Sequence, residues 1–425
     1  MKSLSYGRLW SHRDFNRLWL SDTVSQIGNQ FTNLALPILA VLNLHAGAFE
    51  IGLLMALQTL FFPILGLFVG VWADRLRKRP IMVVCNLGRM AGLASIPLAF
   101  VLSTLTLYQL YAVAAVNGVF TVFFEIAYQS YLPVLIDRED LVEENSKLQT
   151  SASGAQVVGP ALAGFIYQLV GGAITITVDA IGYLISALSL ISIRKPEAKP
   201  ESNSPTGHPD FLEEMKEGIQ IVFDNPTLWR ITACTATSNF GSAIVGAVFV
   251  IFLLNILSFS PVLIGLLGTV GAVGFLLGTV VTPIVTKRLG LGMAIAIPAG
   301  ITVINMAAPL AIYGHAFLIV GTIGLITGIM LPIYNINQVS LRQTIVPDRI
   351  QGRMNATVRT INWGTMPVGA IIGGTLGITV GVIGTILIGG ALQGAAVLWI
   401  VSKHVIHLKE MPKSDELKDS ASVKC

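Results

Sequence analysis

Residues 154–164 read GAQVVGPALAG, and 210 positions later residues 364–374 read GTMPVGAIIGG. Both segments have glycine at their first, sixth and last positions. The same offset aligns two further residue pairs: Asn145 with Asn355, and Gly171 with Gly381. We infer a chain made of two parallel halves, an architecture of membrane carriers in which a pseudo-symmetric pair rocks about a central site.

The composition indicates a polytopic membrane protein. Of 425 residues, 53% are apolar and 12% are charged, whereas soluble domains have roughly 25% charged residues. A helix needs about 20 apolar residues to span a bilayer. Twelve stretches meet this requirement and are predicted as transmembrane helices: about 18–44, 48–71, 81–103, 107–131, 148–170, 173–193, 229–256, 261–285, 291–313, 316–341, 354–378 and 380–402.

Lysine and arginine mark one side of the membrane. Neither residue lies in the six predicted connections that follow odd-numbered spans. Three of the 27 lie within spans (Arg89, Arg230 and Arg359), and the other 24 (27 − 3) lie in the N-terminal segment, the even-numbered connections and the tail. The positive-inside rule then predicts that both termini face the cytoplasm. The net charge of +4 reflects this bias, and we infer no nucleic-acid partner from it.

The expected organisation has four parts: a six-helix bundle at 1–193, a cytoplasmic linker at 194–228, a second bundle at 229–402 and a cytoplasmic tail at 403–425. The first 17 residues are basic and lead directly into a span, so we expect a collar at the cytoplasmic surface and no cleaved signal peptide. The three cysteines are far apart in the sequence and indicate neither a disulfide nor a metal site: Cys85, Cys234 and Cys425.

The connection between spans 2 and 3, residues 70–80, reads GVWADRLRKRP. Gly70 leaves room for a neighbouring helix, and the Asp74 carboxylate suits the positive N-terminal end of a helix. The basic residues Arg75, Lys78 and Arg79 can engage the acidic connection after span 4: Asp137, Glu139, Asp140, Glu143 and Glu144. Such contacts would close the cytoplasmic side and break as it opens. The alternative is simple anchoring of these basic residues at the cytoplasmic surface.

Span 5 carries Gly154, Gly159, Pro160 and Gly164. Small residues four or five apart form a groove that admits a neighbouring backbone, and Pro160 frees a carbonyl group and bends the helix. We predict that Gly159-Pro160 makes a close contact with a helix of the other half. Ordinary helix packing would explain the glycines alone.

Charged side chains inside spans cost about 2.5–3.5 kcal/mol each on insertion scales, so each invites a functional hypothesis. Asp22, Arg89 and Glu125 lie in spans 1, 3 and 4, at a shared depth of roughly 7–13 Å from the cytoplasmic end. Either Arg89 forms a static pair with one of the acids, or protonation of Glu125 or Asp22 is coupled to transport. Asp179 in span 6 has no basic residue at its own depth. It either takes up a proton from outside or serves as a protonated hydrogen-bond donor.

Four uncharged polar residues lie in the first two spans. Gln26, Asn29 and Asn33 follow one face of span 1, and Gln58 lies in span 2. They either line a central cavity or form hydrogen bonds between helices.

The loop at 70–80 resembles the Gly-x-x-x-Asp-Arg-x-Gly-Arg-Arg motif of the major facilitator superfamily, with Arg77 where the family usually has Gly. Span 5 is similar to the Gly-x4-Gly-Pro-x-x-[Gly/Ala]-Gly pattern that this family associates with antiporters. With these two motifs and the stretch FEIAYQSYLP at 124–133, the chain resembles the bacterial branch of the family that contains macrolide-efflux proteins and the enterobactin exporter. The arginine that many proton antiporters carry in span 4 is Ala114 here. The usual proton-coupling arrangement is therefore missing, and another acid must serve if transport is coupled to protons.

The resemblance implies an all-α membrane protein with twelve transmembrane helices in two pseudo-symmetric six-helix bundles. We interpret it as a monomeric exporter of a bacterial plasma membrane, which moves small drug-like or siderophore-like amphiphiles outward in exchange for protons and needs no cofactor. The alternative is an uptake symporter or facilitator of a small metabolite. A membrane enzyme or receptor is disfavoured, because the sequence lacks His-Glu-x-x-His, Gly-x-Ser-x-Gly and a phosphate-binding loop.

Overall fold

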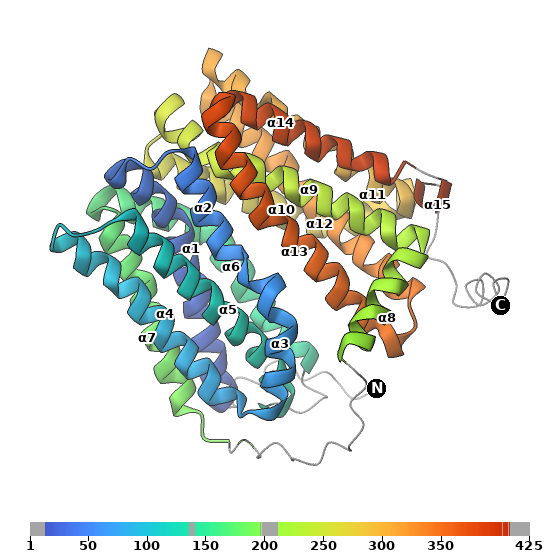
Figure 1. The fold of residues 1–425 in the computed structure, drawn as a ribbon, viewed down its shortest axis with the longest axis horizontal. Helices are drawn as coiled ribbons and strands as arrows, with labels where there is room; N and C mark the ends of the chain where they lie inside the picture. The colour runs from blue at the N-terminus through green and yellow to red at the C-terminus, as the bar shows by residue number, and fades with distance from the viewer. Residues whose placement is uncertain are drawn as a thin grey trace. The chain divides into compact units, whose positions relative to one another are not determined.

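The computed structural model describes residues 13–135, 141–195, 197, 211–401, 403–406 and 408. Within helices, side chains are not described at 67, 70–75, 133–134, 141–145, 211–215, 348–349 and 403–404. All regular secondary structure in these described residues is helical (Figure 1). Contacts divide the chain into two compact units, the first comprising Met1–Ser204 with Ser258–Thr269 and the second Pro205–Leu257 with Val270–Cys425.

The first unit contains seven helices and the start of an eighth. They are α1 (Arg13–Leu44), α2 (Ala48–Thr59), α3 (Phe61–Arg75), α4 (Lys78–Val101), α5 (Leu107–Leu135), α6 (Leu141–Val170), α7 (Gly172–Ser192) and the first nine residues of α10 (Pro261–Leu289). The break between α2 and α3 follows from Pro63, which has no N–H to donate to the carbonyl of Thr59. Within this unit α1 packs against α6 and α7, and α4 packs against α5 and α7.

The second unit contains the remainder of α10 and the helices that complete the chain. They are α8 (Phe211–Asp224), α9 (Pro226–Ile251), α11 (Leu291–Ile301), α12 (Ala316–Ile345), α13 (Asp348–Thr379), α14 (Gly381–Ala395) and α15 (Lys403–Ile406). Three short segments extend them: a π-helical turn at Phe252–Ile256 and 3-10 segments at Thr302–Tyr313 and Ala396–Trp399. At the start of α9, the Asn225 side chain accepts hydrogen bonds from the N–H groups of Thr227 and Leu228, which satisfies two donors that the helix itself leaves free.

The sequence repeat has a structural counterpart. Gly171 and Gly381, which align at the offset of 210, stand at the starts of α7 and α14 with φ of 81° and 78°. A left-handed backbone at such a sharp turn favours glycine, because a side chain would clash with the following carbonyl group. Both halves therefore have a glycine with positive φ where their last long helix begins.

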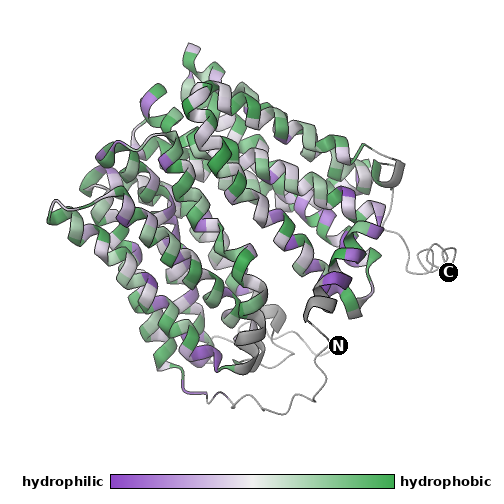
Figure 2. Cartoon of the chain, viewed as in Figure 1, coloured by the Kyte–Doolittle hydropathy of each residue, from purple (hydrophilic) through white to green (hydrophobic). Residues whose placement is uncertain are grey.

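Ten helices in the described residues are long and apolar enough to cross a membrane. The other two predicted spans, about 148–170 and 354–378, correspond to α6 and α13, which are 30 and 32 residues long. Hydrophobic residues predominate along the helices of both units (Figure 2). Many large apolar side chains are exposed, as for Val101 at 79% and Val280 at 73%, as expected of helices that face lipid rather than water.

Candidate functional site

Buried polar side chains gather where α1, α4 and α7 meet in the first unit. Six of them are less than one-tenth exposed: Ser21, Asp22, Asn86, Arg89, Asp179 and Ser186. Buried polar groups persist when their hydrogen bonds are satisfied inside the protein. The arrangement of their partners therefore shows what the cluster can do.

Arg89 is the cation at the centre of this cluster. Its guanidinium lies 4.4 Å from the ring centroid of Phe124 on α5 and 4.4 Å from that of Tyr183 on α7. It also donates a hydrogen bond of 2.5 Å to the side-chain oxygen of Asn86. A cation held between two aromatic faces and an amide keeps its charge away from water, because the rings present their negative faces to it.

The hydrogen bonds continue from Asn86 across to α1. The Asn86 amide donates to the Ser186 hydroxyl at 2.7 Å, and that hydroxyl lies 2.5 Å from the Ser21 hydroxyl. This chain of polar groups fixes α1, α4 and α7 relative to one another.

Asp179 occupies the other end of the cluster. One carboxylate oxygen accepts a hydrogen bond from the Thr32 hydroxyl, and the other has no hydrogen-bond partner among the described residues. Gly28 is required beside it, because a Cβ there would overlap the Asp179 carboxylate. The charge of Arg89 acts on this carboxylate through space. A second link joins the same helices, since the Tyr183 hydroxyl donates to the Asn29 side chain at 2.5 Å.

The other predicted intramembrane residues lie around this cluster. Asp22 is buried and hydrogen-bonds to Gln26. Glu125 is half-buried on α5, directly after Phe124. The described contacts of Arg89 are with Asn86, Phe124 and Tyr183, and the coupling of Arg89 to Glu125 or Asp22 stays a prediction. Two predicted cavity residues lie elsewhere, with Asn33 exposed on α1 and Gln58 half-buried on α2.

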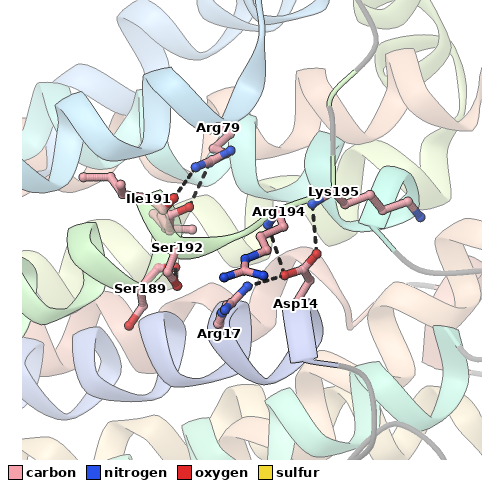
Figure 3. Close-up of polar contacts among 9 residues, drawn as sticks. Asp14, Arg17, Arg79, Ser189, Ile191, Ser192, Arg194 and Lys195 are labelled. Atoms are coloured by element: carbon pink, nitrogen blue, oxygen red, sulfur yellow. Dashed lines mark hydrogen bonds and ion pairs between the residues drawn. The ribbon is translucent and has the colours of Figure 1, made fainter.

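Part of the loop motif can be placed at the end of the first unit where α1 begins and α7 ends, which we call the basic end. The Arg79 guanidinium donates to the carbonyl groups of Leu190 and Ile191, which the end of α7 leaves without helical partners (Figure 3). The carboxylate of Glu197 accepts from the N–H groups of Lys78 and Arg79 at 2.6 and 3.1 Å. Glu197 therefore caps α4, while Arg79 caps α7.

Asp14 ties the start of α1 to the segment that follows α7. Its carboxylate accepts from the N–H groups of Arg194 and Lys195 at 3.1 and 2.9 Å and from the Arg17 guanidinium at 2.7 Å (Figure 3). The Lys195 ammonium donates to the carbonyl of Leu135, the last residue of α5. The structure does not describe the surroundings of Gly70 or the side chains of Asp74, Arg75 and the predicted acidic partners.

The glycines of α6 make contacts of two kinds. A Cβ at Gly159 would lie 2.5 Å from a side-chain carbon of Gln30 on α1, whereas a Cβ at Gly164 would overlap the backbone of Pro261 in α10. A Cβ at Gly265 would in turn overlap the carbonyl oxygen of Pro160. Gly154 has open space beside it, with no atom within 4 Å. Pro160 and Gly164 therefore form the close helix contact, and Gly159 accommodates α1.

A family model described as the Major Facilitator Superfamily matches residues 18–370. The chain belongs to this superfamily. It is 23% identical over 385 residues to macrolide efflux protein A of Streptococcus pyogenes, covering 89% of this chain and 93% of that relative. It is also 23% identical over 380 residues to enterobactin exporter EntS of Citrobacter koseri, covering 88% of each.

Solved structures agree on the fold. A bacterial homologue of the iron transporter ferroportin in an inward-facing state has a TM-score of 0.72 at 15% identity, over 92% of this chain and 99% of that one. The predicted all-α major facilitator fold and the resemblance to the macrolide-efflux and enterobactin-exporter branch are thereby confirmed.

Sequence reasoning found Arg89, Asp179 and Asn29 but missed the residues that join them. Asp179, Tyr183 and Ser186 recur at i, i+4 and i+7 on α7, the spacing of one helix face. Asn86 precedes Arg89 by three residues on α4 and therefore lies on the same face as Arg89. This polar periodicity within otherwise apolar spans was the available signal.

Proposed function

We propose that this major facilitator protein exports small amphiphilic compounds from the cell by alternating access, in exchange for protons. The buried Arg89 cluster in the first unit carries the proposal. A structural membrane protein has little use for a cation and two acids in its apolar spans, since each costs about 2.5–3.5 kcal/mol. The relatives named as macrolide and enterobactin exporters support the outward direction.

Glu125 is our candidate for the residue that carries the proton. It is half-buried on α5 and follows Phe124, whose ring covers the Arg89 guanidinium. In this proposal the charge of Glu125 acts on the same cation. Deprotonated Glu125 would be attracted to Arg89, and protonation would release it and allow a rearrangement of α5. Asp22 and Asp179 tune this exchange, and Asp179 is the second candidate because one of its oxygens lacks a described partner.

The energetics of such exchange are adequate. One charge that crosses a membrane potential of about 150 mV releases roughly 3.5 kcal/mol. That free energy corresponds to a concentration ratio of several hundred. A single proton for each substrate molecule therefore supports substantial efflux.

In this proposal both termini face the cytoplasm, and the helix bundles within residues 1–193 and 229–402 rock as a monomer. The basic end, including Arg75, Lys78 and Arg79, closes the cytoplasmic side when it engages acidic residues, with Asp74 at a helix N-terminus. The close glycine contacts of α6 provide a packed surface that forms in one state.

The test is dye transport in inverted membrane vesicles, with and without an imposed pH gradient. Wild-type protein should accumulate dye only with the gradient, and a substitution of Glu125→Gln should abolish accumulation while sparing energy-independent substrate exchange. A merely structural Glu125 would lose protein level and both activities together. Retained uphill transport in Glu125→Gln moves the assignment to Asp179, whose Asn variant should then alter the pH dependence. Dye movement in the opposite direction would identify an uptake carrier and refute export.

A further inference from the structure

A groove of about 560 Å³ lies at the basic end of the first unit, between α4 and α5. Its lining is apolar apart from one arginine: Leu76, Arg77, Pro80, Ile81, Val84, Cys85, Val119, Phe120 and Phe123. The volume falls within the roughly 300–1,000 Å³ typical of sites for small ligands. Nothing in the proposed transport mechanism uses this groove.

The groove is open to the surroundings of the helices along its length. Val84 is 59% exposed and Leu76 is 43% exposed. Val84 lies on α4, and in a membrane-spanning helix such a side chain faces hydrocarbon chains rather than water. From Arg77, just before α4, to Cys85 the wall extends eight residues, about 12 Å at 1.5 Å per residue. Because the predicted span begins at about 81, the groove reaches from the membrane interface into the outer part of the acyl-chain region.

Arg77 supplies the charge at the mouth of the groove. Its side chain is exposed and has no ion-pair partner among the described residues. The neighbouring helix end offers no competing anion site, because the N–H groups of Lys78 and Arg79 are already taken by Glu197. Arg77 is also the position at which the loop departs from the family pattern, which has Gly there.

We propose that this groove binds an anionic phospholipid, with one acyl chain along the apolar wall and the phosphate paired with the Arg77 guanidinium. A single exposed cation above an apolar wall matches a lipid with a negative headgroup and a hydrocarbon tail. Arginine pairs with phosphate through two parallel N–H···O bonds. The basic end faces the cytoplasmic leaflet in the proposed orientation, and anionic lipids are enriched in that leaflet.

The experiment is native mass spectrometry of the purified full-length protein with phosphatidylglycerol or phosphatidylcholine of identical acyl chains. Wild-type protein should bind phosphatidylglycerol more tightly than phosphatidylcholine. Arg77→Gln should weaken phosphatidylglycerol binding about fivefold, with partial recovery in Arg77→Lys. Phosphatidylcholine binding should weaken less, because the choline ammonium already compensates the charge of its phosphate. Val84→Trp should weaken both lipids, because the indole fills the groove.

Two matched controls separate the groove from general effects. Lys287→Gln removes one cation from the end of α10, and Val101→Trp adds the same bulk at an exposed site of α4 that is outside the groove lining. Both should bind lipids as the wild-type protein does. Thermal stability in detergent identifies any variant that fails to fold, and Val119→Phe replaces Val84→Trp in that case.

The proposal is overturned if Arg77→Gln keeps the preference for phosphatidylglycerol, or if Lys287→Gln loses it equally. It is also overturned if the filling variants leave lipid binding intact but raise the KM for transported dye, since the groove would then hold substrate. Because lipid binding is measured without transport, failure of the export proposal would not change this readout.

Discussion

The helix pair α1 and α7 in the first unit and its repeat counterpart α9 and α14 in the second are joined by different chemistry. Between α1 and α7, three polar side-chain pairs cross the interface: Ser21 with Ser186, Asn29 with Tyr183, and Thr32 with Asp179. Between α9 and α14, Gly241 and Gly389 allow the backbones to approach, and a Cβ at Gly241 would lie 2.7 Å from the Gly389 carbonyl oxygen. Asp179 and Gly389 align at the offset of 210.

The difference shows two ways in which neighbouring helices can associate within lipid. Helices in lipid gain little from apolar burial against one another, so they associate through close packing of small residues or through hydrogen bonds. Asn29 and Asn239 align in the repeat, but Asn29 turns to α7 whereas Asn239 donates to the carbonyl of Asn362 on α13. The first unit has thus placed an ionisable group, Asp179, at the position where the second unit has Gly389 in close backbone contact.

The largest effect is expected when the polar residue of the first unit is placed at the aligned glycine of the second. Gly389→Asp, which installs the residue of the first unit, should prevent recovery of folded protein, with a destabilisation above about 3 kcal/mol. The new Cβ would lie 2.7 Å from Val245 and 2.9 Å from the Gly241 carbonyl oxygen, and the carboxylate would be buried. Yield of monodisperse protein in size-exclusion chromatography measures the effect. Gly324→Asp adds the same charge where no atom lies within 4 Å, and equal loss in both variants would remove the steric argument.

Removal of the buried cation should have the next largest effect. Arg89→Leu should destabilise the protein by about 3 kcal/mol and abolish transport, because it leaves Asp179 without the compensating charge and Asn86 without its donor. Arg89→Lys should keep the charge but lose the planar stacking on Phe124 and Tyr183, giving an intermediate loss. Melting temperature in detergent measures both. A fully stable, active Arg89→Leu protein would show that the cluster is neither structural nor coupled.

The fold could be predicted from the sequence because the hydropathy of each segment and the repeated glycines can be read from the order of the residues. Neither signal requires knowledge of which helices touch. The cluster could be predicted only in part. Arg89 and Asp179 are conspicuous as charges in apolar helices, but the partners of Arg89 depend on how α4, α5 and α7 are rotated about their axes. Phe124 and Tyr183 look like ordinary apolar lining in the sequence.

The ends of the helices illustrate the same limit. The role of Arg79 as an anchor or gate at the cytoplasmic side stays a prediction, and the structure adds that Arg79 caps α7 at Leu190 and Ile191. That contact joins residues more than 100 positions apart, which no local pattern reports. Pro63, by contrast, is a local signal for the break between α2 and α3 within the span predicted at about 48–71.

A third test compares glycines of the aligned helices α6 and α13 that meet different surroundings. A Cβ at Gly154 would have no atom within 4 Å, whereas a Cβ at Gly369 would lie 2.6 Å from the backbone oxygen of Phe240. Gly369→Ala should therefore lower stability by about 1–3 kcal/mol, and Gly154→Ala should not, since a packed helix backbone cannot move aside. Thermal unfolding of both variants decides the point. A larger loss for Gly154→Ala would reverse the contrast.

The smallest expected effect comes from the loss of one hydroxyl. Tyr183→Phe removes the hydroxyl that donates to Asn29 and hydrogen-bonds to Arg89, but it keeps an aromatic face over Arg89. It should cost about 1 kcal/mol and leave transport near the wild-type level. Tyr183→Leu removes both the hydroxyl and the ring and should approach the loss seen in Arg89→Leu. The residue of the second unit that aligns with Tyr183 is Gln393, whose side chain accepts a hydrogen bond from Asn305. Gln393→Leu should lower stability about as much as Tyr183→Phe, without altering the pH dependence of transport. If Tyr183→Phe shifts that pH dependence as strongly as Glu125→Gln, the hydroxyl rather than the ring links Arg89 to proton exchange.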